Sequence, residues 1–541
     1  MTDLRTTNID KLSTELFDVL IIGGGINGAA SAACLAARGV KVALIERNDF
    51  ASGASSNSSN LVWGGVKYLE SFEYPLVSKL CKSRNHLMRS YPSTVREISF
   101  LTTIEKGFRF PTFMVYLGTI LYWFLGRCVT KAPRYFTRKK LQQEEQVINA
   151  DNAAGGFQYS DCYLYDNDAR FVFNFVRTAL NYGCITGNYL ESKGSKKQED
   201  LWHTQVTDQI SGNSLTVRSK IIINACGPYV DTQNRLSDET SLHRHLFSKG
   251  IHLIVDRITP TQRVLAFFAS DGRLFFVIPM GPRTCIGTTD TQLEIPSATV
   301  SEEDRQFVLA NANALLKLDR TLTTEDIIAE RCGVRPLAQK GEDEQADWVK
   351  LSRKHAIDVN EENRYLSIFG GKLTDCINVG EEVAGIVERL GIHAPFPDKI
   401  WYGEPGEDVR AEFLHQARLM DLDSLTSPSS SEPLTQRLWR RYGANALELL
   451  ESIRADRSGA GLLIDNAEYL RCEIEQAARR EMITKLDDFL RRRSKIALVV
   501  NRDAIISSPG LKQACEILFG AEADAKLREY IEATAPQGEA S

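Results

Sequence analysis

Three glycines near the N-terminus have the spacing of a loop that binds a dinucleotide. Gly23, Gly25 and Gly28 fit the pattern G-x-G-x-x-G. The first glycine of such a loop permits a tight turn, the second lets the backbone approach a pyrophosphate, and the third lets a helix pack on a strand. The acidic Glu46 follows at the distance at which a carboxylate can accept hydrogen bonds from an adenosine ribose. These residues predict a dinucleotide site rather than a glycine-rich turn without a nucleotide.

The residues around this motif predict the strands and the helix that must position it. The apolar run 19–22 predicts a buried parallel strand, the alanine-rich run 29–37 predicts a helix ending at Gly39, and 40–45 predicts a second strand. The N-terminus of the helix offers N–H groups and a positive dipole end to phosphates. This fingerprint alone leaves NAD and FAD both open.

Later segments favour a cofactor with a large planar ring. The small, hydroxyl-rich loop 52–60 leads into an apolar segment with Gly64 and Gly65, which suit a close approach of the backbone. An apolar strand precedes the pair Gly370 and Gly371, a second candidate nest for the cofactor. A third strand-to-glycine junction lies at 221–228.

The composition is that of a globular enzyme. The 541 residues allow two to four domains, and 43% hydrophobic and 25% charged residues are ordinary values. A net charge of −5 argues against nucleic acid as a partner. The N-terminus lacks the apolar region of a secretory signal, and the 11 cysteines show no metal-ligand spacing. We therefore expect reduced thiols, no metal site and a cytoplasmic location.

The order of several motifs resembles the FAD-dependent glycerol-3-phosphate dehydrogenase family. These motifs are GGGINGA (23–29), SSNSSNLVWGGVKYLE (55–70), FQYSDCYLYDNDAR (157–170), INACGPYVD (223–231), KGIH (249–252), IGTTDT (286–291), GVRPLA (333–338) and FGGKLT (369–374). The resemblance covers about residues 16–500 and includes a helical C-terminal tail.

The resemblance implies FAD as cofactor and oxidation of sn-glycerol 3-phosphate to dihydroxyacetone phosphate. A hydride would pass from C2 to the flavin N5, and the electrons would pass to a quinone. An oxidase that uses oxygen, and a related flavoprotein dehydrogenase for another phosphorylated polyol or hydroxy acid, remain alternatives. A homodimer is a further possibility. The cofactor-binding residues expected are Gly23, Gly25, Ile26, Asn27, Gly28, Glu46, Ser55, Ser56, Ser59, Gly64, Gly65, Ala225, Gly227, Gly371 and Thr374.

Five residues are candidates for the substrate chemistry that the resemblance implies. A phosphate dianion suits the planar fork of an arginine, and Arg335, expected in a stiff turn, is the candidate clamp. Lys372 is a second cation, and His252, on a strand pattern at the position of the family's active-site histidine, is the candidate base. Lys67 and Tyr68 match substrate-contacting positions of the family. His243 and His245 are expected in a loop.

The chain departs from the family pattern after the second glycine pair. Asp375, Cys376 and Ile377 replace the residues common there, and Asp375 puts an acid near a proposed anion site unless its side chain faces away. This departure leaves a different phosphorylated substrate open. It also motivates a further hypothesis, a flavin-binding protein that has lost catalysis.

The expected fold class is α/β. A Rossmann-like FAD-binding domain (16–100, 150–235 and 355–398) is interleaved with an antiparallel-sheet substrate-binding cap (236–354). A helical insertion (101–149) and an all-α C-terminal domain (399–541) complete the chain.

One segment indicates contact with a membrane surface. Residues 111–126 are uncharged but too short to span a bilayer, and 127–140 hold six Lys or Arg and no acid. An apolar helix beside a basic cluster suits an anionic leaflet, and a buried helix with a solvated basic face is the alternative.

Overall fold

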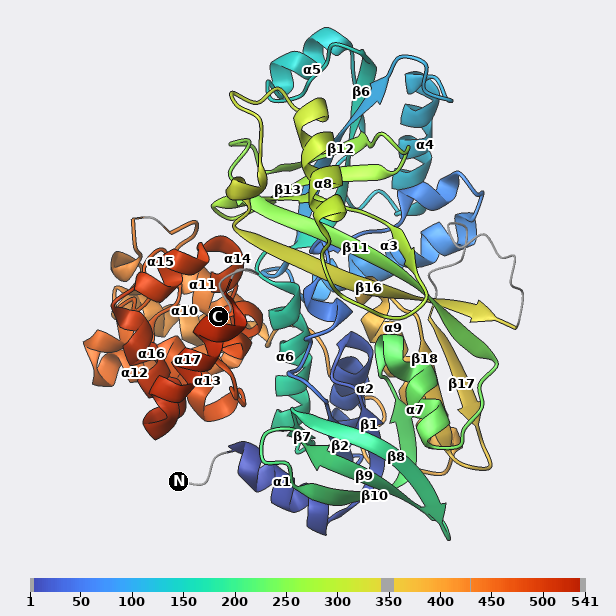
Figure 1. Ribbon diagram of the computed structural model, residues 1–541, viewed down its shortest axis with the longest axis vertical. Coiled ribbons are helices and arrows are strands. Elements are labelled where there is room, and N and C mark those ends of the chain that lie inside the picture. Colours follow the sequence, from blue (N-terminus) through green and yellow to red (C-terminus); the bar gives the residue numbers. More distant parts are fainter. Residues whose placement is uncertain (1–3, 342–354, 429, 536–541) are drawn as a thin grey trace.

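The glycine fingerprint lies at the carboxyl edge of a largely parallel sheet. In the computed structural model, which describes residues 4–341, 355–428 and 430–535, this sheet forms the lower layer of the molecule in Figure 1. The end of the expected cap range, 342–354, lies outside the described residues. The parallel strands run in the order β18 (Tyr365–Phe369), β10 (Ser214–Asn224), β1 (Leu16–Ile22), β2 (Val42–Ile45) and β7 (Ile185–Gly187). β17 (Ala356–Asn360) adds an antiparallel edge, and β8 (Leu190–Gln198) and β9 (Leu201–Asp208) extend β10 as an antiparallel hairpin.

Parallel pairing brings three distant glycine turns together. Ile22 at the end of β1 pairs with Asn224, and Asn224 pairs with Ser367 near the end of β18. The turns that follow these three strands therefore meet at one edge of the sheet, which is where open α/β sheets bind their ligands. Helices α2 (Ile26–Ala37), α6 (Asp168–Asn181) and α9 (Cys376–Arg389) pack beside this sheet around a shared apolar core.

A second, ten-stranded sheet forms the upper layer. Its strands are β3 (Leu61–Val62), β4 (Val95–Glu105), β5 (Arg134–Phe136), β6 (Ala153–Leu164), β11 (His243–Asp256), β12 (Arg263–Phe268), β13 (Leu274–Met280), β14 (Arg283–Gly287), β15 (Thr291–Leu293) and β16 (Ala329–Lys340). They pair antiparallel except for β12 with β4. Helix α8 (Glu302–Leu315) packs on this sheet.

The α/β fold class is confirmed, but the second sheet takes strands from a wider part of the chain than expected. β3, β4 and β6 come from ranges that the sequence analysis gave to the FAD-binding domain and the insertion. Local patterns mark these segments as apolar and extended but do not say which sheet they join, because pairing partners lie far away in sequence. The domain limits stay a prediction.

The remaining helices connect and cover the sheets. They are α1 (Leu4–Thr14), α3 (Tyr74–Ser90), α4 (Thr112–Leu125), α5 (Arg138–Glu144) and α7 (Val230–Leu236). The C-terminal region is all helical, as expected. It holds α10 (Glu407–Leu419), α11 (Leu434–Tyr442), α12 (Ala446–Ala455), α13 (Arg471–Arg480), α14 (Ile496–Val499), α15 (Arg502–Ser507), α16 (Gly510–Phe519) and α17 (Ala523–Ala533).

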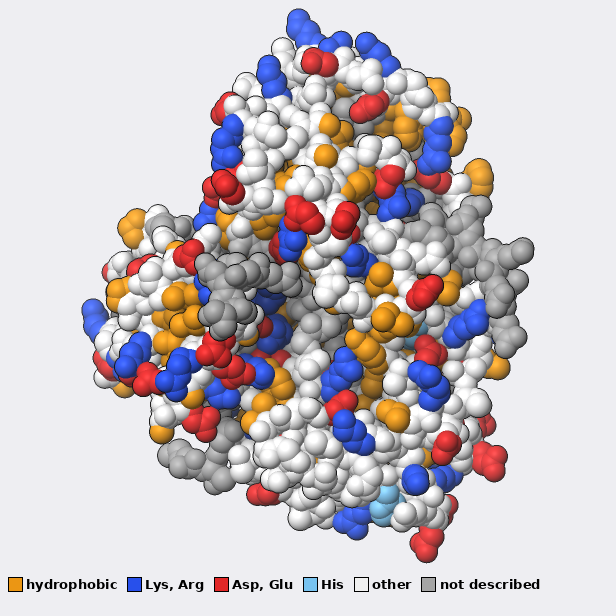
Figure 2. Space-filling model, in the orientation of Figure 1, with side chains coloured by type: hydrophobic (Ala, Val, Ile, Leu, Met, Phe, Trp, Pro, Cys, Tyr) orange, Lys and Arg blue, Asp and Glu red, His pale blue; other side chains and the backbone are white. Residues whose placement is uncertain are grey.

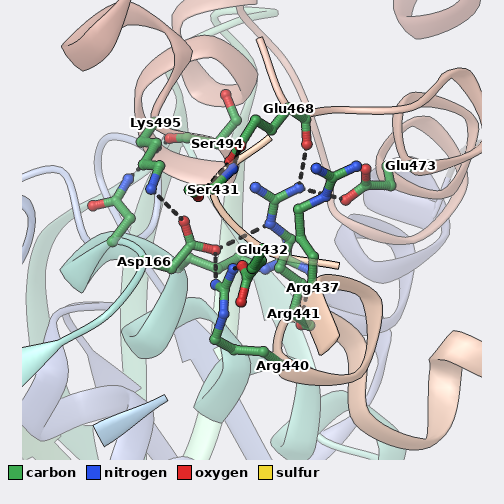
Figure 3. A network of polar contacts seen from close by, with 12 residues as sticks. Asp166, Ser431, Glu432, Arg437, Arg440, Arg441, Glu468, Glu473, Ser494 and Lys495 are labelled. Atoms are coloured by element: carbon green, nitrogen blue, oxygen red, sulfur yellow. Dashed lines mark hydrogen bonds and ion pairs between the residues drawn. The ribbon is translucent and has the colours of Figure 1, made fainter. Parts of the chain in front are cut away.

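Buried ion pairs join this helical region to the α/β body (Figure 3). Asp166, just before α6, pairs with Arg440 at 2.6 Å and Arg441 at 3.1 Å, and Lys495 lies 3.7 Å away. Asp49, in the loop after β2, pairs with Arg493 at 2.8 Å. The helical region is thus fixed against α6 and the first βαβ unit.

Candidate active site

The first glycine turn has the geometry that the fingerprint predicts. Gly23 has φ +112°, and a Cβ there would lie 2.4 Å from the carbonyl oxygen of Ala225. A Cβ on Gly28 would lie 1.9 Å from the carbonyl oxygen of Gly23, so only glycine lets α2 approach β1 this closely. Gly23 and Gly28 therefore have distinct packing reasons to be glycine.

Glu46 faces this turn. Its Oε2 accepts a hydrogen bond from the Gly24 N–H at 2.7 Å and its Oε1 accepts one from the Asn48 N–H at 2.9 Å. Burial raises the pKa of Glu46, while these two hydrogen bonds oppose the rise. The carboxylate is held beside the turn, where a ribose would reach it.

The second glycine turn is fixed from both sides. The Asn27 Nδ2 donates to the Gly370 carbonyl at 3.0 Å, and the Gly370 N–H donates to His245 Nε2 at 3.3 Å. His245 Nδ1 in turn faces Asp231 Oδ2 at 3.2 Å. Gly370 and Gly371 have φ +64° and +97°, a conformation that suits glycine. This turn is therefore anchored to α2, β11 and α7 together.

The two turns border one cleft of about 390 Å³. Nine of the expected cofactor residues line it, namely Gly23, Gly25, Ile26, Asn27, Glu46, Ser55, Ala225, Gly227 and Gly371. Asn27 Oδ1 is buried and has no hydrogen-bond partner among the described residues, so it is able to accept a hydrogen bond from a ligand in the cleft. A cleft with glycine turns, a helix N-terminus and the carboxylate of Glu46 at its edge fits FAD.

Six expected cofactor residues do not line this cleft: Gly28, Ser56, Ser59, Gly64, Gly65 and Thr374. Gly64 packs elsewhere, because its N–H donates to Asp161 and a Cβ on it would meet the Tyr122 hydroxyl at 2.2 Å. The hydroxyl of Ser56 is directed to the backbone carbonyls of its own loop. Their roles toward FAD stay predictions.

The candidate base and clamp share one face of the upper sheet. On β11 and β16, Gly250 lies opposite Gly333 and His252 opposite Arg331, and alternate residues of a strand share a face. The guanidinium of Arg335 covers Gly250, because a Cβ there would lie 2.1 Å from Arg335 Nη2. Arg335 therefore lies beside His252.

His252 is an unusual histidine. Both ring nitrogens are buried and neither has a hydrogen-bond partner among the described residues. Burial, then the charges of Arg335 and Arg331, lower its pKa to about 3. The imidazole is therefore neutral at physiological pH and able to accept a proton. A buried polar group without a partner indicates a place for a ligand.

Arg335 lies within strand β16, so the expected stiff turn at this residue is wrong. The strand places its side chain, and three oxygens hold the guanidinium: Thr288 Oγ1 at 3.0 Å, Asp290 Oδ1 at 3.2 Å and the Thr289 carbonyl at 3.3 Å. Asp290 is itself held by the Ser248 hydroxyl.

The expected loop at His243 and His245 is also wrong, since both lie in β11. The polar H-x-H alternation has a period of two, which fits a strand. This alternation is the feature of the sequence that could have placed His245 on a strand, from which it accepts the hydrogen bond of the Gly370 N–H.

The other substrate candidates lie beside the second glycine turn. Lys372 Nζ sits 4.6 Å from the ring centroid of Tyr68, so these two candidates are in contact. Lys67 is exposed on the short helix Val66–Leu69. The structure thus brings Lys372 to Tyr68 and Arg335 to His252.

Asp375 faces α3 and not the cleft. Its carboxylate receives hydrogen bonds from Ser83 Oγ at 3.0 Å and from His355 Nδ1 at 2.9 Å, and Lys79 lies 3.7 Å away. Burial raises the pKa of Asp375, but these hydrogen bonds and charges outweigh it and lower the pKa. The acid is neutralised by its own partners, so it does not oppose an anion site.

Asp168 connects the serine loop to strand β16, a role that the sequence did not indicate. Asp168 accepts from the Ser58 N–H at 2.9 Å and pairs with the buried Arg331 at 3.4 Å, and Arg331 donates to the Ser58 carbonyl at 2.7 Å. Arg331 thus fixes the serine loop against the strand that carries Arg335. The feature of the sequence that could have indicated this role of Arg331 is its position four residues before Arg335, which puts both side chains on the same face of a strand.

Two family models match parts of this chain, and relatives match nearly its whole length. Residues 18–355 match the family model described as FAD dependent oxidoreductase, and residues 410–516 match the C-terminal domain of alpha-glycerophosphate oxidase. The aerobic glycerol-3-phosphate dehydrogenase of Bacillus subtilis is 30% identical over 93% of this chain and 92% of its own length. Glycerol-3-phosphate dehydrogenase 2 of Mycobacterium tuberculosis is 31% identical over 90% of this chain and 82% of its own.

Solved structures share the fold. The glycerol-3-phosphate dehydrogenase of Bacillus halodurans complexed with FAD aligns with a TM-score of 0.73 and 24% identity over 98% of this chain and 97% of its own. The glycine oxidase of Geobacillus kaustophilus aligns with a TM-score of 0.52 and 19% identity over 70% of this chain and 95% of its own. From the matched family model and the similarity to its relatives over nearly the whole length, this chain belongs to the FAD-dependent glycerol-3-phosphate dehydrogenase family and is an FAD-dependent oxidoreductase.

Proposed function

We propose that this protein oxidises sn-glycerol 3-phosphate at C2 to dihydroxyacetone phosphate and passes the electrons to a quinone. The observation that carries the proposal is the neutral, buried and unpartnered imidazole of His252 beside the guanidinium of Arg335. An anion clamp next to a proton acceptor suits a substrate that carries a phosphate and a hydroxyl group. The names of the relatives in Bacillus subtilis and Mycobacterium tuberculosis support this substrate.

Each residue has a defined task in this proposal. Arg335 binds the substrate phosphate through its fork, already oriented by Asp290 and the Thr288 hydroxyl. A ring nitrogen of His252 takes the proton of the C2 hydroxyl while the C2–H bond breaks with its electron pair. Lys372, supported by Tyr68, offers a second positive charge near the glycine turn. Bound FAD supplies the oxidising power, since its ring system accepts a hydride.

Anaerobic reduction of the holoenzyme tests the proposal. Addition of sn-glycerol 3-phosphate should bleach the flavin absorbance, while glycerol, which lacks the phosphate, should not at the same concentration. Unchanged absorbance with the phosphorylated substrate would overturn the substrate assignment and leave the FAD fold intact.

Reoxidation of the reduced enzyme separates a quinone from oxygen as acceptor. The match of residues 410–516 to a domain named for an oxidase gives the oxygen-using enzyme a specific basis. Under the proposal a soluble quinone restores the flavin absorbance much faster than air-saturated buffer. A faster reaction with oxygen would assign an oxidase.

We further propose that α4 contacts a membrane surface. Phe113, Leu117, Leu121 and Phe124 lie at helical spacing on one stripe of α4, and Phe113 and Phe124 are 60% and 61% exposed. Orange apolar side chains lie over α4 at the upper right of Figure 2, with both basic (blue) and acidic (red) side chains around them. No helix among the described residues has the length and apolar character to cross a bilayer. A basic, apolar surface suits an anionic leaflet.

The membrane proposal predicts binding to vesicles that contain anionic phospholipid. Replacement of Phe113 and Phe124 by serine should reduce cosedimentation with such vesicles without lowering flavin content. Equal cosedimentation of this variant and the unmodified protein would contradict the contact through α4.

A further inference from the structure

A second hollow, away from the FAD cleft, is lined by positive side chains. It measures about 370 Å³ and its lining residues are Lys82, Asn85, His86, Arg89, Ser90 and Arg127. None of the described residues that line it is acidic. Lys82, Arg89 and Arg127 are exposed and form no ion pair among the described residues.

Three of these side chains lie on one face of α3. Lys82, His86 and Arg89 follow one another at i, i+4 and i+7, so they are neighbours on the helix surface. An anion in the hollow would face the positive charges of Lys82 and Arg89 together.

The fourth cationic residue, Arg127, has an uncommon backbone conformation. Arg127 and the next residue, Cys128, both have positive φ, +59° and +56°, where a residue with a Cβ is uncommon. The position directly after a helix with this conformation is usually glycine. An arginine is found here instead, after the end of α4, and it lines the hollow together with residues of α3.

The base of the hollow is rigid. The side chain of Asn85 is buried, its Nδ2 donates to the Gly126 carbonyl at 2.9 Å, and its Oδ1 accepts from Arg84 Nη2 at 2.8 Å. Asn85 thus ties α3 to the end of α4 and fixes Arg127 relative to Arg89. The neighbouring acid Glu404, whose N–H donates to the Ser90 carbonyl, directs its carboxylate to Ser93 and Trp439 instead.

We propose that the hollow between α3 and the end of α4 binds a phosphate group, carried by a phospholipid headgroup or by a soluble phosphate ester. Two arginine forks and a lysine suit the charge and the oxygens of a phosphate better than those of a carboxylate. The hollow also lies at the end of the apolar stripe of α4, because the Arg127 N–H donates to the carbonyl of Phe124. Phosphate binding here is separate from the substrate site and does not depend on the proposed reaction.

A titration of the holoenzyme with inorganic phosphate, followed by 31P NMR, tests the proposal. The double variant Arg89→Gln, Arg127→Gln should lose one class of phosphate site and keep the KM for sn-glycerol 3-phosphate. Arg335→Gln should lose only the other class. If Arg335 binds no phosphate, the unmodified protein has only one class of phosphate site, and only the Arg89→Gln, Arg127→Gln variant removes it. The proposal for the hollow and the proposal for the substrate site can therefore fail independently of each other.

Matched variants distinguish specific phosphate binding in the hollow from a general effect of the protein's net charge. Lys11→Gln with Lys196→Gln removes the same charge from exposed positions and should leave both classes of site unchanged. Arg89→Lys with Arg127→Lys keeps the charge but loses the forks and should weaken phosphate binding at least tenfold. Equal phosphate binding by the Arg89→Gln, Arg127→Gln variant and the unmodified protein would overturn the proposal, with thermal unfolding used to confirm that both are folded.

Vesicles identify the source of the phosphate. If the ligand is a headgroup, the Arg89→Gln, Arg127→Gln variant binds vesicles with anionic phospholipid less well than the Lys11→Gln, Lys196→Gln variant, and inorganic phosphate competes with the vesicles. If vesicle binding is the same for both variants while phosphate binding is lost, the ligand is a soluble phosphate ester.

Discussion

At the scale of single residues, the proposed chemistry depends on Arg335 and His252, because the charge of Arg335 lowers the pKa of His252. Arg335 is one of the charges that lower the pKa of His252, so the clamp also keeps the base neutral. A bound phosphate would offset part of this charge and make the imidazole a better proton acceptor when substrate is present. Binding and proton transfer are therefore linked through the distance between two side chains.

Replacement of Arg335 by alanine should raise KM for sn-glycerol 3-phosphate roughly 100-fold, the loss expected for a charge-assisted pair of hydrogen bonds. The pKa of His252 should rise as well, because one of the charges that lower it is removed. Steady-state kinetics and the pH dependence of kcat/KM measure both effects. Arg320→Ala, which removes an exposed arginine paired with Asp326, is the control. Unchanged KM in Arg335→Ala would remove this residue from the site.

At the scale of elements, the second glycine turn depends on a histidine from the other sheet. His245→Ala removes the acceptor for the Gly370 N–H and should weaken FAD binding roughly fivefold, as expected for one hydrogen bond of about 1 kcal/mol. His245→Gln offers an amide oxygen and should recover part of the loss. Flavin fluorescence measures the affinity, and the exposed His415→Ala is the control. Equal affinity in all variants would contradict the role of His245.

His355 predicts a pH dependence of stability at the junction of α3 and α9. Burial lowers its pKa, but hydrogen bonds to Asp375 and Glu382 outweigh this and raise it to about 9. Because the pKa is raised on folding, the stabilisation is complete below about pH 6.5 and is lost as the pH rises through 9. It amounts to at most about 3 kcal/mol, from 1.36 kcal/mol per pKa unit.

His355→Gln should therefore lower the thermal unfolding temperature at pH 6, and the difference should vanish toward pH 9. His393→Gln changes an exposed histidine in the same part of the chain and should have no such effect. A difference that is constant between pH 6 and 9 would show that the charge of His355 is not the cause.

At the scale of the whole molecule, the buried ion network of Figure 3 holds the helical region on the α/β body. Burial raises the pKa of Asp166, but the charges of Arg440, Arg441 and Lys495 outweigh it and keep the pKa well below its usual range. One carboxylate thus offsets several buried cations from two helical segments.

Asp166→Asn removes the carboxylate that Arg440, Arg441 and Lys495 share, leaving Arg440 with Glu432 and Arg441 with Glu473, and should cost about 3–5 kcal/mol of stability. We expect faster proteolysis between the α/β body and the helical region, together with a lower thermal unfolding temperature. Asp151→Asn, which alters an exposed ion pair with Arg138, should change stability by less than about 1 kcal/mol. Similar behaviour of both variants would show that the network does not fix the helical region.

The sequence by itself determined the local geometry of the cofactor site. Gly23, Gly28 and Glu46 lie within one βαβ unit, where spacing along the chain sets spacing in space, and the close packing predicted at Gly23 and Gly28 is found. The helix at α4 and the helical C-terminal region also follow from local periodicity. Such features need only near neighbours, so a single sequence carries them.

The tertiary structure alone decided which distant residues meet. Strand pairing of β11 with β16 puts Arg335 beside His252, and pairing of β10 with β18 brings Gly370 to the first glycine turn. His245 and Arg331 acquire their roles only through these pairings, and Asp375 is directed to α3 by partners far from it in sequence. The physical reason is that register between strands depends on the packing of whole sheets, and no local pattern specifies it.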